Sequence, residues 1–364
     1  MDKNSVLLVG GYGVVGKQIA HLIRSRHPEL RIIIGGRTPQ KAEALALELG
    51  NAEIAQVDVT QPNPLGNLAP GAILQLVNDP HDYLILDAAS RGIPFVDITR
   101  WTEHLRATRA RLENISLNAP VILSSAWMAG IAVWSALYAA QNLSEVDSVE
   151  IGILYSLKDK SGPNSVEYMD RLAIPFEVTQ NGKTEIVRAL SHPRKVDFLQ
   201  GKPRTAYLFD IPDQFTLPQA LRAKTTLGRM TFDDDFSIQL LSLLVRSGIW
   251  KLLSSERFTS LRRAILHNPG QGGEHQITTE VKGWDSNRQR KGITVRICDP
   301  LGQTHLTALG AVAQFERLIG ADGAPAPTAG VYFPETASPQ VESVFQFLKQ
   351  NGAQVKFENH KSDI

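Results

Sequence analysis

Short apolar runs and amphipathic stretches alternate along the chain up to about residue 125. The apolar runs predict buried strands at 6–9, 31–34, 54–57, 73–77, 94–96 and 121–123. Apolar residues at helical spacing predict helices between them, at 16–25, 39–49, 81–91 and 103–112. This alternation is typical of a parallel sheet with helices on its faces, so we expect that fold for the first part of the chain.

The pattern changes after about residue 145. Strands are now predicted in close succession, at 149–155, 185–189, 204–209, 277–282, 293–297 and 305–307. The turn Asp299-Pro300-Leu301-Gly302 between two of them favours an antiparallel or mixed sheet. The mostly apolar stretch 236–253 predicts one long helix packed on this sheet; a dimer interface and the wall of a hydrophobic substrate site are the alternatives.

A glycine motif joins the first predicted strand to the first predicted helix. Gly11, Gly13 and Gly16 form a Gly-x-Gly-x-x-Gly pattern, with Tyr12, Val14 and Val15 between them. In this context the first glycine permits a tight turn, the second lets the backbone approach a pyrophosphate, and the third lets the helix pack closely on its strand. The motif predicts a dinucleotide site; the alternative is an ordinary strand–turn–helix with incidental glycines.

The end of the second strand indicates which dinucleotide binds. A NAD-binding domain usually places Asp or Glu here, whereas this chain has Gly35-Gly36-Arg37-Thr38. No carboxylate would repel a 2′-phosphate, and Arg37 offers a charged, planar fork that suits one. Thr38 and Lys41 add a hydroxyl and a second charge. We therefore predict NADP, the alternative being a solvated arginine with Thr38 as a helix N-cap.

Polar residues at other predicted strand ends are the next site candidates, because ligands of open parallel sheets bind at the carboxyl edge. Asp58 and Val59 follow the third strand, where a carboxylate can accept from an adenine amino group or cap a turn. Asn78 ends the fourth strand. His81 and Asp97 are the candidates for proton handling. The alternatives are a surface histidine at the start of a helix and a structural role for Asp97. Ser124 and Ser125 are candidates to bind the nicotinamide carboxamide or the substrate.

These predictions combine into an α/β protein with a Rossmann-type parallel sheet domain and a second α/β domain. We expect the dinucleotide-binding domain at 1–128 and a substrate and dimerisation domain at 129–310. Residues 311–364 are expected to form a C-terminal segment, with a Gly/Ala/Pro linker at 320–327, a helix at 341–348 and a strand at 353–357. The 364 residues suit two domains.

Residues 120–140 are almost uncharged and long enough to span a membrane. The sequence favours instead a short strand at 120–123, a small-residue turn at Ser124-Ser125-Ala126 and a buried helix from Gly130. We therefore predict no stable membrane span. The first predicted strand begins too early to leave room for a signal peptide, so we expect a cytoplasmic protein.

Composition narrows the function further. The net charge of +1, from 38 basic and 37 acidic residues, argues against a nucleic-acid partner held by bulk electrostatics. Cys298 is the single cysteine, which excludes an internal disulfide and a cysteine-cluster metal site and suits a small buried strand residue. The run Asp233-Asp234-Asp235 is predicted to cap the following helix, because three consecutive carboxylates cannot all face one ion. We predict no metal.

Together these motifs resemble the saccharopine dehydrogenase-like family. The resemblance is carried by the glycine motif, Gly36-Arg37-Thr38, Val57-Asp58-Val59-Thr60 and Phe95-Val96-Asp97-Ile98-Thr99, and more weakly by 210–218, 306–310 and 330–335. It implies a Rossmann domain, a second α/β domain that receives the substrate, and a returning C-terminal segment. Members mostly form or oxidise secondary amines of amino acids, while relatives reduce enoyl groups. The turns at 78–81 and 124–128 differ from the family pattern, so saccharopine itself is not predicted as the substrate.

The second domain supplies the remaining candidates. Tyr168, Arg171, Arg204 and Asp210 are predicted to line the substrate cleft, and either arginine suits a carboxylate clamp; exposed surface arginines are the alternative. We predict an NADPH-dependent oxidoreductase and homodimer that reduces an imine derived from an amine or amino acid. An enoyl reductase of an acyl or polyketide chain, and an NADP-binding regulator without turnover, are the alternatives.

Overall fold

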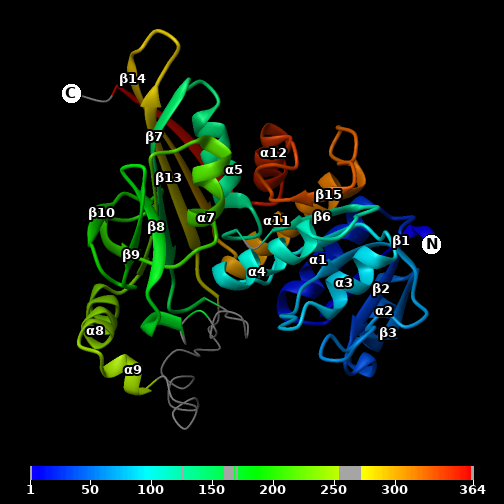
Figure 1. The fold of residues 1–364 in the computed structure, drawn as a ribbon. Helices are drawn as coiled ribbons and strands as arrows, with labels where there is room; N and C mark the ends of the chain where they lie inside the picture. The colour runs from blue at the N-terminus through cyan, green and yellow to red at the C-terminus, as the bar shows by residue number, and fades with distance from the viewer. Residues whose placement is uncertain (1, 125, 160–167, 169–170, 254–271, 362–364) are drawn as a thin grey trace. The chain divides into compact units, whose positions relative to one another are not determined.

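The chain is divided into two compact units. The computed structural model describes residues 2–124, 126–159, 168, 171–253 and 272–361 (Figure 1). The first unit comprises Met1–Gly130 and Thr307–Gln340, and the second comprises Ile131–Leu306 and Val341–Ile364. The predicted boundaries after residues 128 and 310 lie near two of the points at which the chain passes between units, while the end of the chain is shared between both units. Each unit is described separately below.

The first unit is built on a parallel sheet. Its strands are β1 (Asp2–Val9), β2 (Arg31–Gly36), β3 (Ala52–Gln56), β4 (Pro70–Gln75), β5 (Phe95–Asp97), β6 (Pro120–Leu123) and β15 (Gly330–Tyr332). Within the described residues their order is β15-β6-β5-β4-β1-β2-β3, and every pair is parallel. The buried positions 6–9 of β1 and 72–74 of β4 are all apolar, as expected for strands covered on both faces of the sheet. The predicted parallel sheet is thereby confirmed.

Helices connect these strands as the amphipathic pattern predicts. They are α1 (Val14–Arg26), the 3-10 helix η1 (Pro39–Ala42), α2 (Glu43–Leu49), α3 (Tyr83–Ser90) and α4 (Thr102–Glu113). Helix α1 buries Gly16, Ile19, Ala20 and Ile23, one face at helical spacing.

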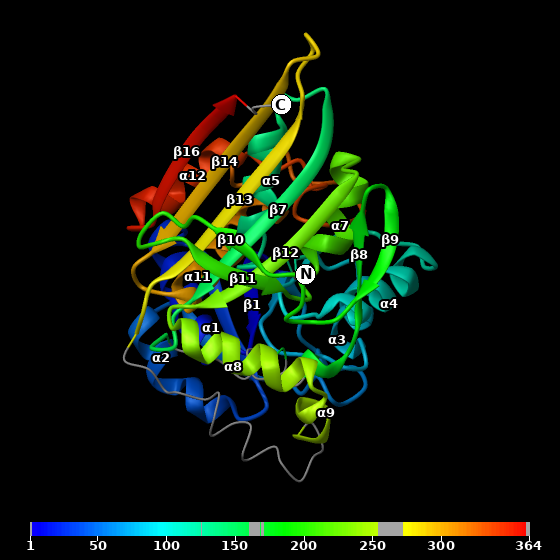
Figure 2. The same cartoon turned by 90° about the vertical axis from the view of Figure 1, so that its left-hand side faces the viewer.

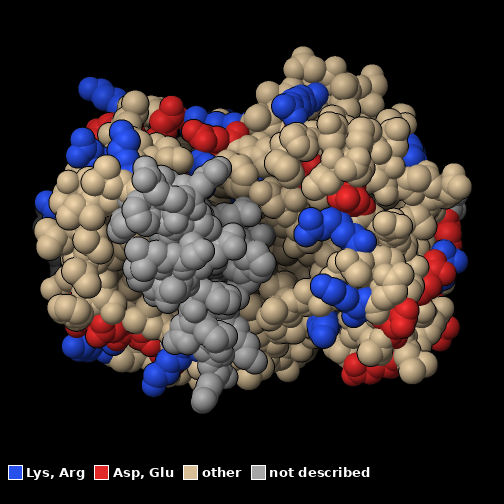
Figure 3. Space-filling view, turned by 90° about the horizontal axis from the view of Figure 1, so that it is seen from below, with Lys and Arg blue, Asp and Glu red and all other residues tan. Residues whose placement is uncertain are grey.

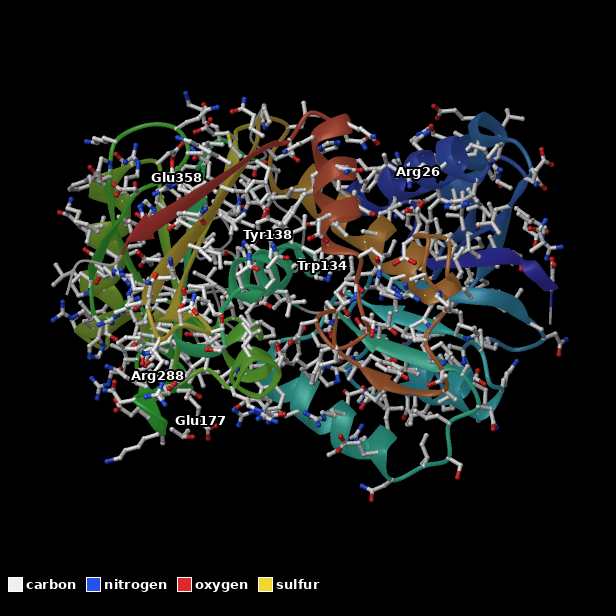
Figure 4. The ribbon with its side chains drawn as sticks, turned by 90° about the horizontal axis from the view of Figure 1, so that it is seen from above. Arg26, Trp134, Tyr138, Glu177, Arg288 and Glu358 are labelled. Atoms are coloured by element: carbon white, nitrogen blue, oxygen red, sulfur yellow. The ribbon has the colours of Figure 1, made fainter. Side chains whose placement is uncertain are left out.

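One long helix of this unit differs from the prediction. Residues 305–307 were expected to form a strand, but they lie in α11 (Gln303–Ile319). The alternation His305-Leu306-Thr307 is too short to separate strand from helix, and the apolar residues continue at helical spacing to Leu318. Within the first unit Glu316 of α11 binds Arg26 at 2.6 Å and His27 at 2.9 Å, at the end of α1 (Figure 4). Burial raises the pKa of Glu316, but these hydrogen bonds outweigh it and the pKa is lowered.

The second unit contains a mixed sheet, as the closely spaced strands predict. Its strands are β7 (Glu145–Tyr155), β8 (Phe176–Gln180), β9 (Lys183–Val187), β10 (Arg194–Val196), β11 (Arg204–Leu208), β12 (Thr225–Phe232), β13 (His275–Trp284), β14 (Arg290–Asp299) and β16 (Gln354–Lys361). Among the described residues the order is β10-β11-β12-β7-β13-β14-β16, with β8 pairing β12 and β9. Only the β12–β7 pair is parallel among these contacts (Figure 2).

The helices of the second unit are α5 (Ile131–Ala140), the 3-10 helix η2 (Arg171–Ala173), α7 (Asp213–Leu221), α8 (Asp235–Arg246), α9 (Ile249–Leu253) and α12 (Val341–Gln350). The prediction of a single helix at 236–253 is wrong. The helix is interrupted at Gly248, whose φ of 81° does not fit a helix, so α8 and α9 are separate. The strand and buried helix predicted within 120–140 are confirmed by β6 and α5.

The core of the second unit forms around α5. Trp134 is 1% exposed, and Tyr138, one turn later on the same helix, places its ring 5.4 Å from Phe345 of α12 and 4.4 Å from Phe357 of β16 (Figure 4). Such aromatic pairs add to the stabilisation from buried area. Residues from three distant parts of the sequence therefore close this core.

No helix in the described parts of the chain has the length and apolar character needed to cross a bilayer. On the face seen in Figure 3, the described residues include small groups of both acidic and basic side chains.

Replacing Trp134 with alanine is expected to lower the free energy of unfolding by about 3–5 kcal/mol, because a fully buried large side chain leaves a cavity. The matched control is Trp284→Ala, whose side chain is 37% exposed and whose loss should cost about 1 kcal/mol or less. Urea unfolding of the two variants measures the difference. Equal losses would contradict the packing described for α5.

Candidate functional site

The glycine motif forms the turn between β1 and α1. Gly13 donates its backbone N–H to the Gly10 carbonyl at 2.9 Å, and Gly11 donates to Leu8 at 3.1 Å. A Cβ atom on Gly16 would lie 2.7 Å from the backbone of Gly11, closer than real atoms approach. Only glycine therefore lets the first turn of α1 lie against the end of β1, as the motif predicts.

The N-terminus of α1 is open to a ligand. Among the residues that the structure describes, no side chain caps it at Gly13, and its first turn contains no acidic residue. The first N–H groups of a helix have no partner within the helix, and the helix dipole gives this end a partial positive charge. A diphosphate satisfies both requirements. The residues present therefore fit the predicted dinucleotide.

The end of β2 presents three polar side chains. Gly35 and Gly36 are buried, whereas Arg37, Thr38 and Lys41 are exposed. In the described parts of the chain, these three side chains form no hydrogen bond or ion pair, and Thr38 leaves η1 without a side-chain cap. Two cationic groups and a hydroxyl thus remain available to an anion.

Asp58 lies after β3 at the same edge of the sheet. Its Oδ1 accepts from the backbone N–H of Thr60 at 3.0 Å and from the Thr60 hydroxyl at 2.7 Å. These hydrogen bonds, and to a smaller extent Arg37, lower the pKa of Asp58. The contacts are those of a turn cap, one of the two predicted roles, and its neighbour Val59 is buried.

The loop after β4 is organised by a residue that the sequence analysis did not select. Asp79 accepts from the backbone N–H groups of Tyr83 at 3.2 Å and Leu84 at 2.9 Å, so it caps α3. Its burial raises the pKa of this carboxyl. Asn78 is half-buried, while the predicted catalytic residue His81 is exposed, with its ring 5.2 Å from that of Tyr83.

Asp97, the other predicted catalytic residue, is completely buried at the end of β5. One carboxyl oxygen accepts from the Thr99 backbone at 2.8 Å and the Thr99 hydroxyl at 2.7 Å; the other accepts from Gln75 at 3.2 Å and from Arg100. Both carboxyl oxygens of Asp97 therefore already accept hydrogen bonds from the protein. These contacts match the structural role that the sequence left open.

Arg100 joins Asp97 to a second buried carboxylate. Its guanidinium, completely buried, also pairs with Asp82, which accepts further hydrogen bonds from Thr108 at 2.9 Å and Arg111 at 2.6 Å and lies 3.0 Å from His104. Burial raises the pKa of Asp82, but His104 and Arg100 outweigh it and lower the pKa to about 2. Burial lowers the pKa of Arg100, yet its two carboxylate partners raise it overall.

Sequence analysis missed this network, although part of it is visible in the sequence. His104 and Thr108 are four residues apart and so lie on one side of α4, and Arg100 lies two residues before this helix. Their partner Asp82 lies on a different loop, at a φ of 61°, and nothing in the sequence indicates that it meets them.

The end of β6 lies beside Asp97. The Ser124 N–H donates to the Asp97 carbonyl at 2.7 Å, so β5 and β6 bring these two candidates together. Ser124 is completely buried, and in the described parts of the chain its hydroxyl oxygen has no hydrogen-bond partner. Ser125 lies outside the described residues.

The structure describes all four candidates of the second unit. Tyr168 places its ring 6.0 Å from that of Phe209, the residue before Asp210, and both candidates are half-buried. Arg171 begins η2. Arg204 forms an ion pair of 2.9 Å with Asp235, so binding a substrate carboxylate there requires competition with Asp235.

The three consecutive aspartates have three different functions. Asp234 accepts from the Ser237 N–H at 2.7 Å and caps α8, as predicted. Asp233 accepts from Ser156 at 2.5 Å, while Asp235 pairs with Lys202 and Arg204. Their carboxylates therefore do not converge.

Two buried titratable groups of the second unit are held uncharged. Burial raises the pKa of the Cys298 thiol to about 12, as expected for a strand residue that takes no part in nucleophilic chemistry. Burial also lowers the pKa of His275 to about 3.

The sheet order, the glycine turn and the open helix N-terminus define the first unit as a dinucleotide-binding domain of the Rossmann type. Residues 6–117 match the family described as "Saccharopine dehydrogenase NADP binding domain". This match confirms, for that part of the chain, both the resemblance and the predicted NADP-binding domain.

One solved structure shares the fold of the whole chain. Saccharopine dehydrogenase (L-Glu forming) from Saccharomyces cerevisiae is 12% identical, with a TM-score of 0.65 over 98% of this chain and 99% of that one. A myo-inositol dehydrogenase from Corynebacterium glutamicum is 13% identical over 99% of each chain, with a TM-score of 0.42. No curated protein matches the sequence. At these identities the first likeness shows the fold alone, which confirms the predicted two-domain α/β architecture.

Replacing Asp82 with asparagine is expected to lower the free energy of unfolding at pH 7 by about 3 kcal/mol, because Arg100 loses one of its two buried carboxylates. The folded-state pKa of about 2 lies below the ordinary value of 3.8, so charged Asp82 stabilises the fold above pH ~4. This contribution disappears as the pH falls through the folded-state value.

Unfolding of both proteins between pH 7 and pH 2 measures the effect, and the two curves are expected to converge toward pH 2. Asp147→Asn, whose side chain is 38% exposed, is the matched control and should shift stability by about 0.5 kcal/mol or less. A constant difference at every pH would contradict the assignment to the Asp82 charge.

Proposed function

We propose that the protein is an NADPH-dependent oxidoreductase that reduces an imine derived from an amine or an amino acid. The observation that carries the proposal is the set of donors after β2, formed by Arg37, Thr38 and Lys41, whose side chains form no hydrogen bond or ion pair in the described parts of the chain and which follow the glycine turn of the matched domain. The domain match supports the choice of cofactor. A homodimer and a cytoplasmic location belong to the same proposal.

The preference for NADP over NAD rests on charge. The ribose of NAD is usually held by a carboxylate at the end of the second strand, and here that place holds Gly36 and Arg37. An exposed guanidinium without an internal partner gains two charge-assisted hydrogen bonds by binding a 2′-phosphate. Asp58 nearby is turned to Thr60, so it does not neutralise Arg37 by an ion pair.

The chain's own residues would position the reactants and handle the proton. When bound, NADPH supplies the hydride. Asn78 and Ser124 follow β4 and β6, on either side of Asp97 in the sheet order, and suit binding of the nicotinamide end. We assign Asp97 to positioning, because its carboxylate is already engaged by Arg100 and Thr99. His81 keeps the proposed role of proton donor, since its exposed ring reaches solvent.

The imine is proposed from the likeness to saccharopine dehydrogenase and from the second-unit arginines. Arg171 is the better carboxylate clamp, because Arg204 already pairs with Asp235. Tyr168 and Asp210 complete the proposed substrate side.

A second candidate, reduction of an acyl or polyketide double bond, is favoured by one observation. Helices α8 and α9 expose large apolar side chains, at Phe236, Leu240, Leu243, Ile249 and Leu252. Such a surface would bind an apolar substrate better than it would bind an amino acid.

Titration with NADPH and NADH is expected to show tighter binding of NADPH. Arg37→Ala should weaken NADPH binding by about 1–3 kcal/mol through the loss of charge-assisted hydrogen bonds, and leave NADH binding unchanged. The matched control is Arg31→Ala at the other end of β2, where Arg31 pairs with Asp2 and Glu53. Nucleotide fluorescence measures each affinity. Equal binding of both nucleotides would exclude the NADP assignment.

Oxidation of NADPH is expected with imines formed from amino acids, and Arg171→Ala should raise the KM for them while kcat changes less. The assay sets these substrates against simple amine-derived imines and enoyl thioesters. Turnover of enoyl thioesters alone would favour the second candidate. Nucleotide binding without any turnover would favour the non-catalytic regulator.

A further inference from the structure

Tyr12 occupies an informative place within the glycine turn. It lies between Gly11 and Gly13, is half-buried, and leans over the end of β2. A Cβ atom on Gly36 would lie 2.6 Å from the Tyr12 hydroxyl oxygen and 2.8 Å from Cζ. The ring therefore covers the space above Gly36, where a side chain would otherwise begin.

This contact leaves no room for a side chain at position 36 while the Tyr12 ring keeps its place. Gly36 has no positive φ, so its backbone would accept alanine or aspartate without strain. The three atoms nearest to such a Cβ all belong to the Tyr12 side chain, so a substituent must push the ring aside. The carboxylate that holds the ribose of NAD belongs to this end of the strand. Tyr12 thus fills the place in which a NAD-type carboxylate would be built.

The hydroxyl of Tyr12 is also uncommitted. No hydrogen bond to it is present in the described parts of the chain, although a phenol both donates and accepts. It lies above Gly36, the residue before Arg37, whose guanidinium likewise has no ion-pair partner there. The neutral Tyr12 hydroxyl and the positively charged Arg37 guanidinium therefore lie at the same end of β2.

We propose that Tyr12 is a selectivity residue for the dinucleotide: its ring keeps position 36 free of a side chain, and its hydroxyl donates a hydrogen bond to the 2′-phosphate beside Arg37. This inference rests on the proposed function. Selectivity then depends on the glycine turn as well as on the residues after β2. A ring that merely fills space would affect both nucleotides alike.

The test measures the ratio of the NADH and NADPH dissociation constants in the full-length protein. The variants are Tyr12→Phe, Tyr12→Ala, Gly36→Ala and the double variant Tyr12→Ala/Gly36→Ala. Tyr332→Phe is the matched control. Tyr332 lies on β15, at the opposite edge of the sheet from β2 and β3, and its hydroxyl lies 3.0 Å from that of Thr328. Thermal unfolding of each variant establishes that it is folded.

Tyr12→Phe is expected to weaken NADPH binding about tenfold and leave NADH binding unchanged, because one hydrogen bond to a charged group is lost. Gly36→Ala should reduce the ratio by a similar factor, since it displaces the ring. The double variant should be no less selective than Tyr12→Ala, because both changes remove the same contact. The control should keep the wild-type ratio.

Unchanged selectivity in Tyr12→Phe, or additive losses in the double variant, would overturn the inference. If Arg37→Ala still lowers NADPH affinity in that case, the proposed function stands without Tyr12. If the wild-type protein itself shows no preference for NADPH, the proposed function and the role of Tyr12 both fail.

Discussion

The close contact between Gly16 and the backbone of Gly11 is the constraint on which the first unit depends. Without a Cβ at this position, α1 begins directly against the end of β1, and its uncapped N-terminus lies at the carboxyl edge of the sheet. The neighbouring strands then bring Arg37, Asp58 and Asp97 to the same edge. The absence of a side chain at Gly16 therefore determines the position of the α1 N-terminus, where we expect an anionic ligand to bind.

Buried charge organises the other part of that edge. Arg100 is completely buried and is held by Asp97 of β5 and by Asp82 of the loop before α3. Removing two charges from water is costly, and only near-complete hydrogen bonding offsets it. The network leaves little freedom to the loops after β4 and β5, which gives the half-buried Asn78 and the buried Ser124 fixed surroundings. It also explains why Asp97, which the strand-end rule selects for chemistry, is engaged within the protein.

Sequence patterns were sufficient for the features that depend on local spacing. The parallel strands, the glycine turn, the mixed sheet and the cap at Asp234 all follow from neighbouring residues. The patterns failed where a run was too short to separate strand from helix, and where distant residues decide the contacts. The residues 305–307 resemble a strand until the buried positions of α11 are known, and the partners of Arg100 are separated from it by up to eighteen positions. The sequence could place the site residues at strand ends, but it could not predict their hydrogen-bond and ion-pair partners.

The course of the chain has a consequence for how the protein reaches its native state. The sheet of the first unit is incomplete until β15 pairs with β6, some two hundred residues earlier, and the second unit waits for β16 to pair with β14. Contacts of such large sequence separation form slowly, because a long loop must close before they contribute. During synthesis, strands β6 and β14 therefore present unpaired edges until the last part of the chain emerges. A truncation before residue 330 would remove both β15 and β16 and leave β6 and β14 as unpaired edge strands, which would favour aggregation of both units.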